Sequence, residues 1–237
     1  MRGWGVFGLP LDSGHVLALR VFPENSFAPY RTVWHRDPDG PWAIYVDGPE
    51  IDLVCPRYYG AACHHVGPAD IELAWTGPVS LRVRASGPSL DLEWIVDVHE
   101  ILGIALVNRL GRSLPSWTWR PGPLVRVREL LARHAFGLGD LRLSGTMPSG
   151  HVGVLMPKRM HRLAASRAVL NGDDLGAPTR LAECPTIGGV TVPARGVLAV
   201  GEAAWEPSRR ARSKTSGSTV MFSRFLGMRC SAWNMCI

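Results

Sequence analysis

The sequence predicts a mainly β protein, built of antiparallel barrel or sandwich lobes with an inserted pair of helices. Three observations predict this: apolar and polar residues alternate in several short segments, Gly and Pro turns separate those segments, and helical spacing begins after residue 98. With 237 residues, 46% of them hydrophobic, the chain is long enough to bury a substantial core.

The clearest strand signal lies at residues 89–98, where every second residue is apolar and should point to one side. These residues are Leu90, Leu92, Trp94, Val96 and Val98. Further strands are predicted at 15–22, 31–35, 42–46, 63–66, 71–76 and 79–84. We therefore expect about seven strands in a first β lobe, residues 1–98.

A helical pair is expected over residues 99–137, from the spacing of apolar residues at 99–112 and 123–136. Pro123 suits the first turn of the second helix, and Gly137 suits its end. In that helix the apolar residues are predicted to share a buried face and the arginines to be more exposed. The apolar set is Leu124, Val127, Leu130 and Leu131, and the basic set is Arg126, Arg128 and Arg133.

A second β segment is predicted over residues 138–206, with strands at 141–147, 151–156, 160–165, 168–170, 190–192 and 196–205. Asn171-Gly172 is a strong hairpin signal, because both residues tolerate the left-handed backbone of a tight turn. The strands of this segment either form a separate sheet or continue the first one.

The charge of the chain is concentrated at its end. Residues 208–237 contain six basic residues and no acidic one, and the rest of the chain has 20 of each, so this stretch accounts for the net charge of +6. We predict that residues 207–237 form a basic tail that is disordered or atypical. A neutral body offers no general attraction for phosphates, and we therefore expect no nucleic-acid partner.

Five irregularly spaced cysteines and the lack of a signal-peptide pattern indicate a cytoplasmic protein with reduced thiols. No apolar run approaches the ~20 residues of a transmembrane segment. The segment from Cys55 to Cys63, His64 and His65 contains metal-ligating residue types, but adjacent strand residues face opposite sides. Without a nucleophile elbow or phosphate loop either, we expect no metal, no cofactor and no recognisable catalytic motif, and enzyme activity stays open.

Several segments carry a family resemblance. GPWAIYVDGPEIDLVCPRYYG, IELAWTGPVSLRV and LDLEWIVDV resemble the first half of a group of uncharacterised actinobacterial proteins, and LRLSGTMPSGHVGVLMPKRMHRLAASRAVLNGDDLG resembles the second half. That group is distantly similar to the lipocalin-like AttH and carotenoid 1,2-hydratase proteins. The resemblance implies two β-barrel lobes and a lipophilic ligand.

The candidate ligand-binding residues are aromatic and acidic side chains of the first lobe: Trp34, Trp42, Trp75, Trp94, Asp47 and Asp91. Large aromatic rings commonly line apolar pockets, although they also fill ordinary cores. The first hypothesis is therefore the binding of a small lipophilic molecule. The second is a hydratase or isomerase that uses a buried carboxylate such as Asp47 or Asp91. The third is attachment to membranes or nucleic acid through the basic helix and tail.

Overall fold

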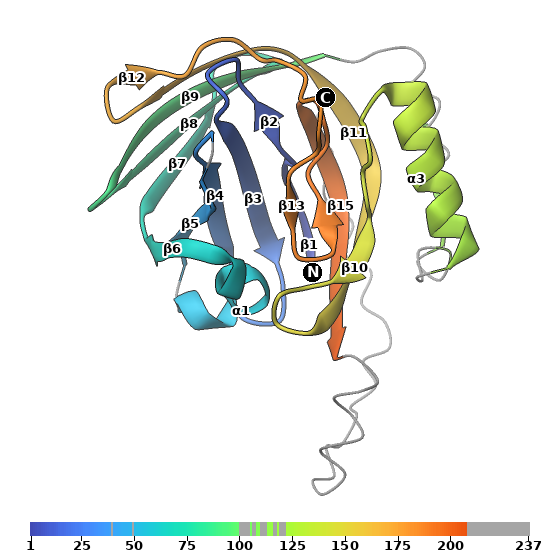
Figure 1. The fold of residues 1–237 in the computed structure, drawn as a ribbon. Helices are drawn as coiled ribbons and strands as arrows, with labels where there is room; N and C mark the ends of the chain where they lie inside the picture. The colour runs from blue at the N-terminus through green and yellow to red at the C-terminus, as the bar shows by residue number, and fades with distance from the viewer. Residues whose placement is uncertain are drawn as a thin grey trace, which may run out of the picture.

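The computed structural model describes residues 1–38, 40–48, 50–99 and 122–207, together with a few single positions between 100 and 121. Most of the helix predicted at 99–112, and the predicted tail 207–237 beyond its first residue, lie outside the described residues. Within them the protein is mainly β, as predicted (Figure 1). In chain order the elements are β1 Arg2–Val6, β2 Leu9–Pro10, β3 Val16–Glu24, β4 Tyr30–Arg36, β5 Trp42–Asp47, α1 Cys55–Tyr59, β6 Cys63–Pro68, β7 Asp70–Trp75, β8 Ser80–Gly87, β9 Leu90–His99, α3 Pro123–Phe136, β10 Ser144–Thr146, β11 His151–Leu170, β12 Asp173–Asp174, β13 Thr186–Ile187, β14 Val190–Thr191 and β15 Val197–Pro207.

Strands from both β segments belong to one curved sheet, with the order β6-β5-β4-β3-β1-β15-β11-β9-β8-β7 (Figure 1). The N-terminal strand β1 joins the two parts, because it pairs with β3 on one side and with β15 on the other. The pairing is antiparallel except between β5 and β6, where the chain crosses over through α1. Among the described strands no pairing joins β7 to β6, so the sheet is open.

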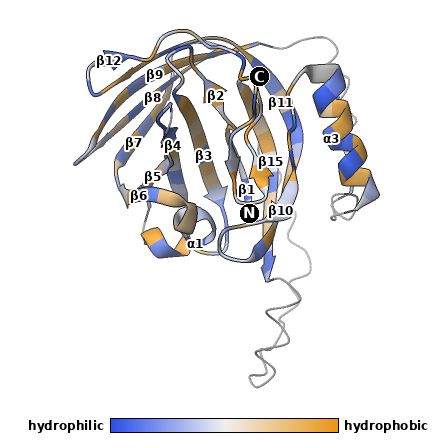
Figure 2. Ribbon diagram, viewed as in Figure 1, coloured by the Kyte–Doolittle hydropathy of each residue, from blue (hydrophilic) through white to orange (hydrophobic). Residues whose placement is uncertain are grey.

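The two faces of the sheet are buried in different clusters. On β3, Leu17, Leu19 and Val21 belong to the main core, which also contains Trp94. Ala18 and Phe22 point to the other face and pack in a second cluster with side chains of α1 and of the β13–β14 hairpin. Figure 2 shows hydrophobic residues along most of β3 and β15, as expected of strands covered on both faces.

The alternation predicted at 89–98 is confirmed: the apolar residues of β9 are buried except Ile95, which is half-buried. Two of the longer strands, β1 and β11, differ from the predictions. Strand β1 was not predicted, because its sequence RGWGV places glycines where a strand signal needs side chains. The segments predicted at 151–156, 160–165 and 168–170 form the single strand β11, whose register shifts between Pro157 and Arg159 and between Leu163 and Ala165 absorb the breaks.

Helix α3 is present as predicted, and Gly137 ends it with a left-handed backbone, φ 62°. The predicted buried face is wrong, however. Its residues are 52–57% exposed, whereas Val125 and Ala132 are buried in a cluster with residues of β11 and β15. A tertiary contact sets this rotation, since the Leu143 amide donates a hydrogen bond to the Glu129 carboxylate at 2.7 Å.

Candidate functional site

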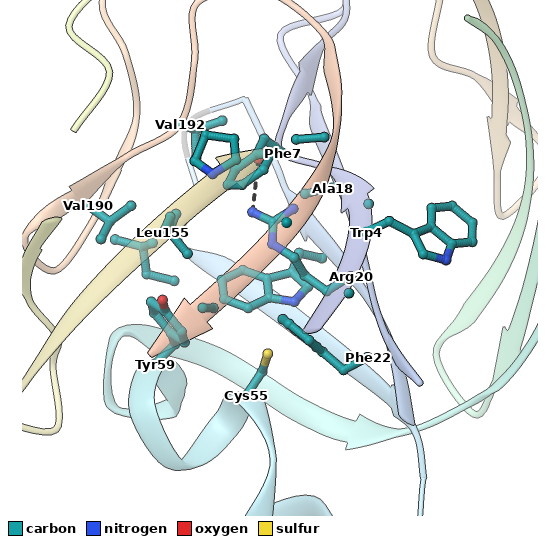
Figure 3. A pocket seen from close by; sticks show the side chains of 18 of the residues that line it. Trp4, Phe7, Ala18, Arg20, Phe22, Cys55, Tyr59, Leu155, Val190 and Val192 are labelled. Carbon is teal, nitrogen blue, oxygen red and sulfur yellow. Dashed lines mark hydrogen bonds between the residues drawn. The ribbon is translucent and has the colours of Figure 1, made fainter. Parts of the chain in front are cut away.

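A cavity of about 60 Å³ lies on the outer face of the sheet, away from the main core. Strands β1, β3, β4 and β15 form its floor, and α1 and the β13–β14 hairpin cover it (Figure 3). The floor thus combines strands from the two ends of the chain, and the predicted first lobe does not contain the cavity by itself.

Small residues on two neighbouring strands line the cavity. Gly3 and Gly5 of β1 lie opposite Gly201 and Ala199 of β15, and residues directly opposite each other share a face. All four line the cavity. Their neighbours Trp4 and Val200 alternate to the other face and pack against the main core, and Figure 3 shows the Trp4 indole pointing away.

Aromatic side chains form much of the cavity wall. The Trp34 ring meets Trp42 and Tyr59 edge-on, with ring centroids 6.2 and 5.0 Å apart. The Trp34 Nε1–H donates to the Thr32 hydroxyl at 2.8 Å. The Trp205 Nε1–H donates to the Tyr59 hydroxyl at 3.3 Å. These hydrogen bonds give each indole N–H group a partner. The apolar surfaces of the rings can then line the cavity.

Arg20 is the cationic side chain in this wall (Figure 3). Its Nη1 donates to the carbonyl oxygens of Val6 at 2.5 Å and Leu19 at 3.1 Å, and its Nη2 donates to Phe7 O at 3.1 Å. The guanidinium carbon lies 4.7 Å from the centroid of the Phe7 ring and 5.6 Å from that of Trp34. The side chain is half-buried and lines the cavity.

The charge of Arg20 has no carboxylate partner among the described residues. Glu202 is the acidic residue that borders the cavity, but it lies opposite Arg2 on the other face and its carboxylate contacts that residue at 3.8 Å. Burial raises the pKa of Cys55 and of Tyr59, so the nearby thiol and phenol are neutral near pH 7. Burial lowers the pKa of Arg20, yet an arginine stays protonated in proteins.

Two of the six predicted site residues, Trp34 and Trp42, line the cavity. Trp94 is fully buried in the main core, where its Nε1–H donates to Ser166 Oγ at 2.8 Å. Trp75 is 38% exposed and contacts Trp4.

Neither predicted carboxylate borders the cavity. Asp47 pairs with Arg31 at 3.1 Å, and Asp91 is exposed at the start of β9. The structure therefore distributes the six predicted site residues over both faces of the sheet and the protein surface.

Sequence reasoning missed Arg20. The signal was its place in VLALRVF, where an arginine stands among apolar residues on both sides of a strand. Alternation puts it on the same face as Ala18 and Phe22. A charge at a position that should be buried on such a strand marks a site that needs explanation.

The metal-ligating side chains of the segment from Cys55 to His65 do not come together at one point. Cys55 Sγ lies 3.5 Å from the Tyr30 hydroxyl, and Cys63 Sγ donates to Tyr59 O at 3.5 Å. In the described part of the chain a different group, His15, His35 and Asp37, brings three ligand atoms within 4.8 Å of one another.

That second group is held by a direct contact between its two imidazoles. His15 Nδ1 and His35 Nε2 are 2.9 Å apart, and the ring planes are within 16°. The Asp37 carboxylate oxygen stays 3.8 and 3.6 Å from these nitrogens. The two facing nitrogens are at the distance of a direct N–H···N hydrogen bond, which a metal ion would have to break.

Comparisons of the chain with protein-family models, with curated proteins and with solved structures gave no match. Among the described residues no helix has the length and apolar character that crossing a membrane requires.

Proposed function

We propose that the protein binds a small organic molecule in the cavity between the sheet and its covering layer. The observation that carries this proposal is the cavity itself: small residues on β1 and β15 line it, and aromatic rings form much of its wall. Pockets that are mostly apolar with a few placed polar groups are the usual design of small-molecule sites.

The volume limits the size of the ligand. About 60 Å³ is far below the roughly 300–1,000 Å³ of sites for drug-sized ligands. The proposed ligand therefore has only a few non-hydrogen atoms inside the cavity. The lipophilic ligand and the lipocalin-like fold that the sequence resemblance implies stay predictions.

The two other hypotheses lack a supporting observation. A hydratase or isomerase would need a carboxylate at the cavity, and the one that borders it, Glu202, lies on the opposite face with Arg2. Of the arginines on α3, Arg133 contacts Asp140 and Arg128 donates to Thr118 O at 2.8 Å. The Arg133–Asp140 ion pair reduces the free charge that a membrane or nucleic acid would meet, and the contact with Thr118 holds the Arg128 side chain against the protein.

The test is a titration of the ¹⁵N-labelled full chain with neutral and anionic molecules of three to five carbons, followed by NMR. We expect saturable shifts at amides of β1, β3 and β15. Ala199→Val should abolish them, because its added methyl groups enter the cavity, and Ala203→Val provides a second filling variant. Ala74→Val, the same change at an exposed position of β7, should leave binding intact. Shifts that are absent, or that survive both filling variants, would overturn the proposal.

A further inference from the structure

We infer that the cavity selects a short-chain carboxylic acid, whose carboxylate Arg20 binds and whose carbon chain contacts the aromatic wall. This inference rests on the proposed function and names the ligand class. It starts from an imbalance: Arg20, a half-buried cation at an apolar cavity, has no carboxylate partner among the described residues, although charges removed from water in proteins are normally paired.

The hydrogen bonds already made by Arg20 leave two of its guanidinium N–H groups for a ligand. Of the five N–H groups, two on Nη1 and one on Nη2 donate to Val6 O, Leu19 O and Phe7 O. The remaining groups, on Nε and Nη2, have no hydrogen-bond partner among the residues described. Two N–H groups of a guanidinium are the number that binds a carboxylate in bidentate fashion.

The three backbone carbonyls position the guanidinium but do not neutralise it. They tie Arg20 to the end of β1 and to the following residue Phe7, and the rings of Phe7 and Trp34 pack against the cation. The side chain is thereby held in place before any ligand arrives, which lowers the entropy lost on binding.

The rest of the cavity favours an acid with a short carbon chain over a bare anion. Leu155, Val190 and Val192 line it together with Trp34 and Trp42. A molecule such as propionate or butyrate would place its carboxylate at Arg20 and its methylene groups against these side chains. Inorganic phosphate offers the charge without the apolar part.

The experiment compares butyrate with butyramide, which has the same shape without the charge, on the full-length protein by NMR titration. We expect the acid to bind roughly ten- to a hundredfold more tightly than the amide, the range for hydrogen bonds to charged groups. The Arg20 Nε–H resonance should shift with the acid. Arg20→Met should remove the preference, whereas Arg20→Lys should retain part of it.

Arg31→Met is the matched control. Arg31 also lies on a strand of this sheet and donates to a backbone carbonyl, that of Ile71 at 2.6 Å, but it faces Asp47 outside the cavity. This variant should bind butyrate as the wild type does.

The outcomes separate the inference from the proposed function. Equal binding of acid and amide would overturn the inference and leave the cavity as a site for neutral molecules. Binding of neither would overturn both. If phosphate competes as strongly as butyrate, the assignment of the ligand to the carboxylic acids would be overturned. If Arg20→Met fails to fold, the comparison of acid and amide on the wild type and on Arg20→Lys still decides the matter.

Discussion

The guanidinium of Arg20 lies 5.6 Å from the ring of Trp34, on the same face of neighbouring strands. The register of β3 and β4 pairs Trp34 with Ala18 and Thr32 with Arg20, which makes Arg20 and Trp34 diagonal neighbours. The hydrogen bond from Trp34 to Thr32 orients the indole at this position. An aromatic ring, in place of a carboxylate, therefore lies beside the half-buried cation.

Replacing Trp34 with phenylalanine should show how much this hydrogen bond contributes. Trp34→Phe keeps a ring but removes the donor, and we expect the free energy of unfolding to fall by about 1–2 kcal/mol. A double-mutant cycle with Thr32→Val, measured by urea denaturation, should give a coupling energy of about 1 kcal/mol. A coupling energy near zero would show that the bond does not hold the indole.

Truncating Trp94 should damage folding and spare the cavity. Trp94→Ala is expected to lower the free energy of unfolding by about 3–5 kcal/mol, the range for large aromatic residues in cores. Trp75→Ala should cost only about 1 kcal/mol, because Trp75 is partly exposed and its main partner is Trp4. Similar losses of stability for the two variants would contradict the placement of these residues.

The glycine at position 5 should not tolerate a side chain. A Cβ at Gly5 would collide with the carbonyl oxygen of Leu19 on β3. We expect Gly5→Ala to destabilise the protein by about 1–3 kcal/mol, as overpacked sites do. Gly77→Ala is the control, because its nearest neighbour would be a Ser80 atom at 3.9 Å. Thermal denaturation of both variants tests the prediction, which a neutral Gly5→Ala would refute.

Stability should fall in mild acid because of His35. Burial lowers the pKa of His35 to about 4, outweighing the attraction of Asp37, which raises it; His15 and His64 lower it further. The unfolded chain has a pKa of about 6.5 at this residue, so it binds more protons than the folded chain between these values. The stabilising contribution is therefore complete above about pH 6.5 and is lost as the pH falls towards about 4.

The measurement is the free energy of unfolding of the wild type and of His35→Gln between pH 7 and 4.5. The variant should show a shallower loss of stability with acid, because it lacks the group that takes up the proton. His99→Gln, at an exposed position, should keep the wild-type slope. Parallel slopes for the wild type and His35→Gln would mean that His35 does not titrate in this range.

Much of the secondary structure could be predicted from the sequence, because strand alternation and turn residues are local properties. Strand β9 and the Asn171-Gly172 turn illustrate this: Asn171 and Gly172 adopt the positive φ angles, 52° and 93°, that their residue types allow. The alternation also predicts that Trp94 and Leu92 share a face. The alternation does not determine in which hydrophobic cluster that face is buried.

Only the tertiary structure decided the location of the cavity. Its floor joins Gly3 and Gly5 to Ala199 and Gly201, residues nearly 200 positions apart whose pairing no local pattern encodes. The same holds for Arg20: in the sequence it is one charge in an apolar strand, and only the fold places it beside Trp34 without an ion pair to any described carboxylate. Alternation defines two faces of each strand, and long-range strand pairing then determines which of those faces come together around a shared space.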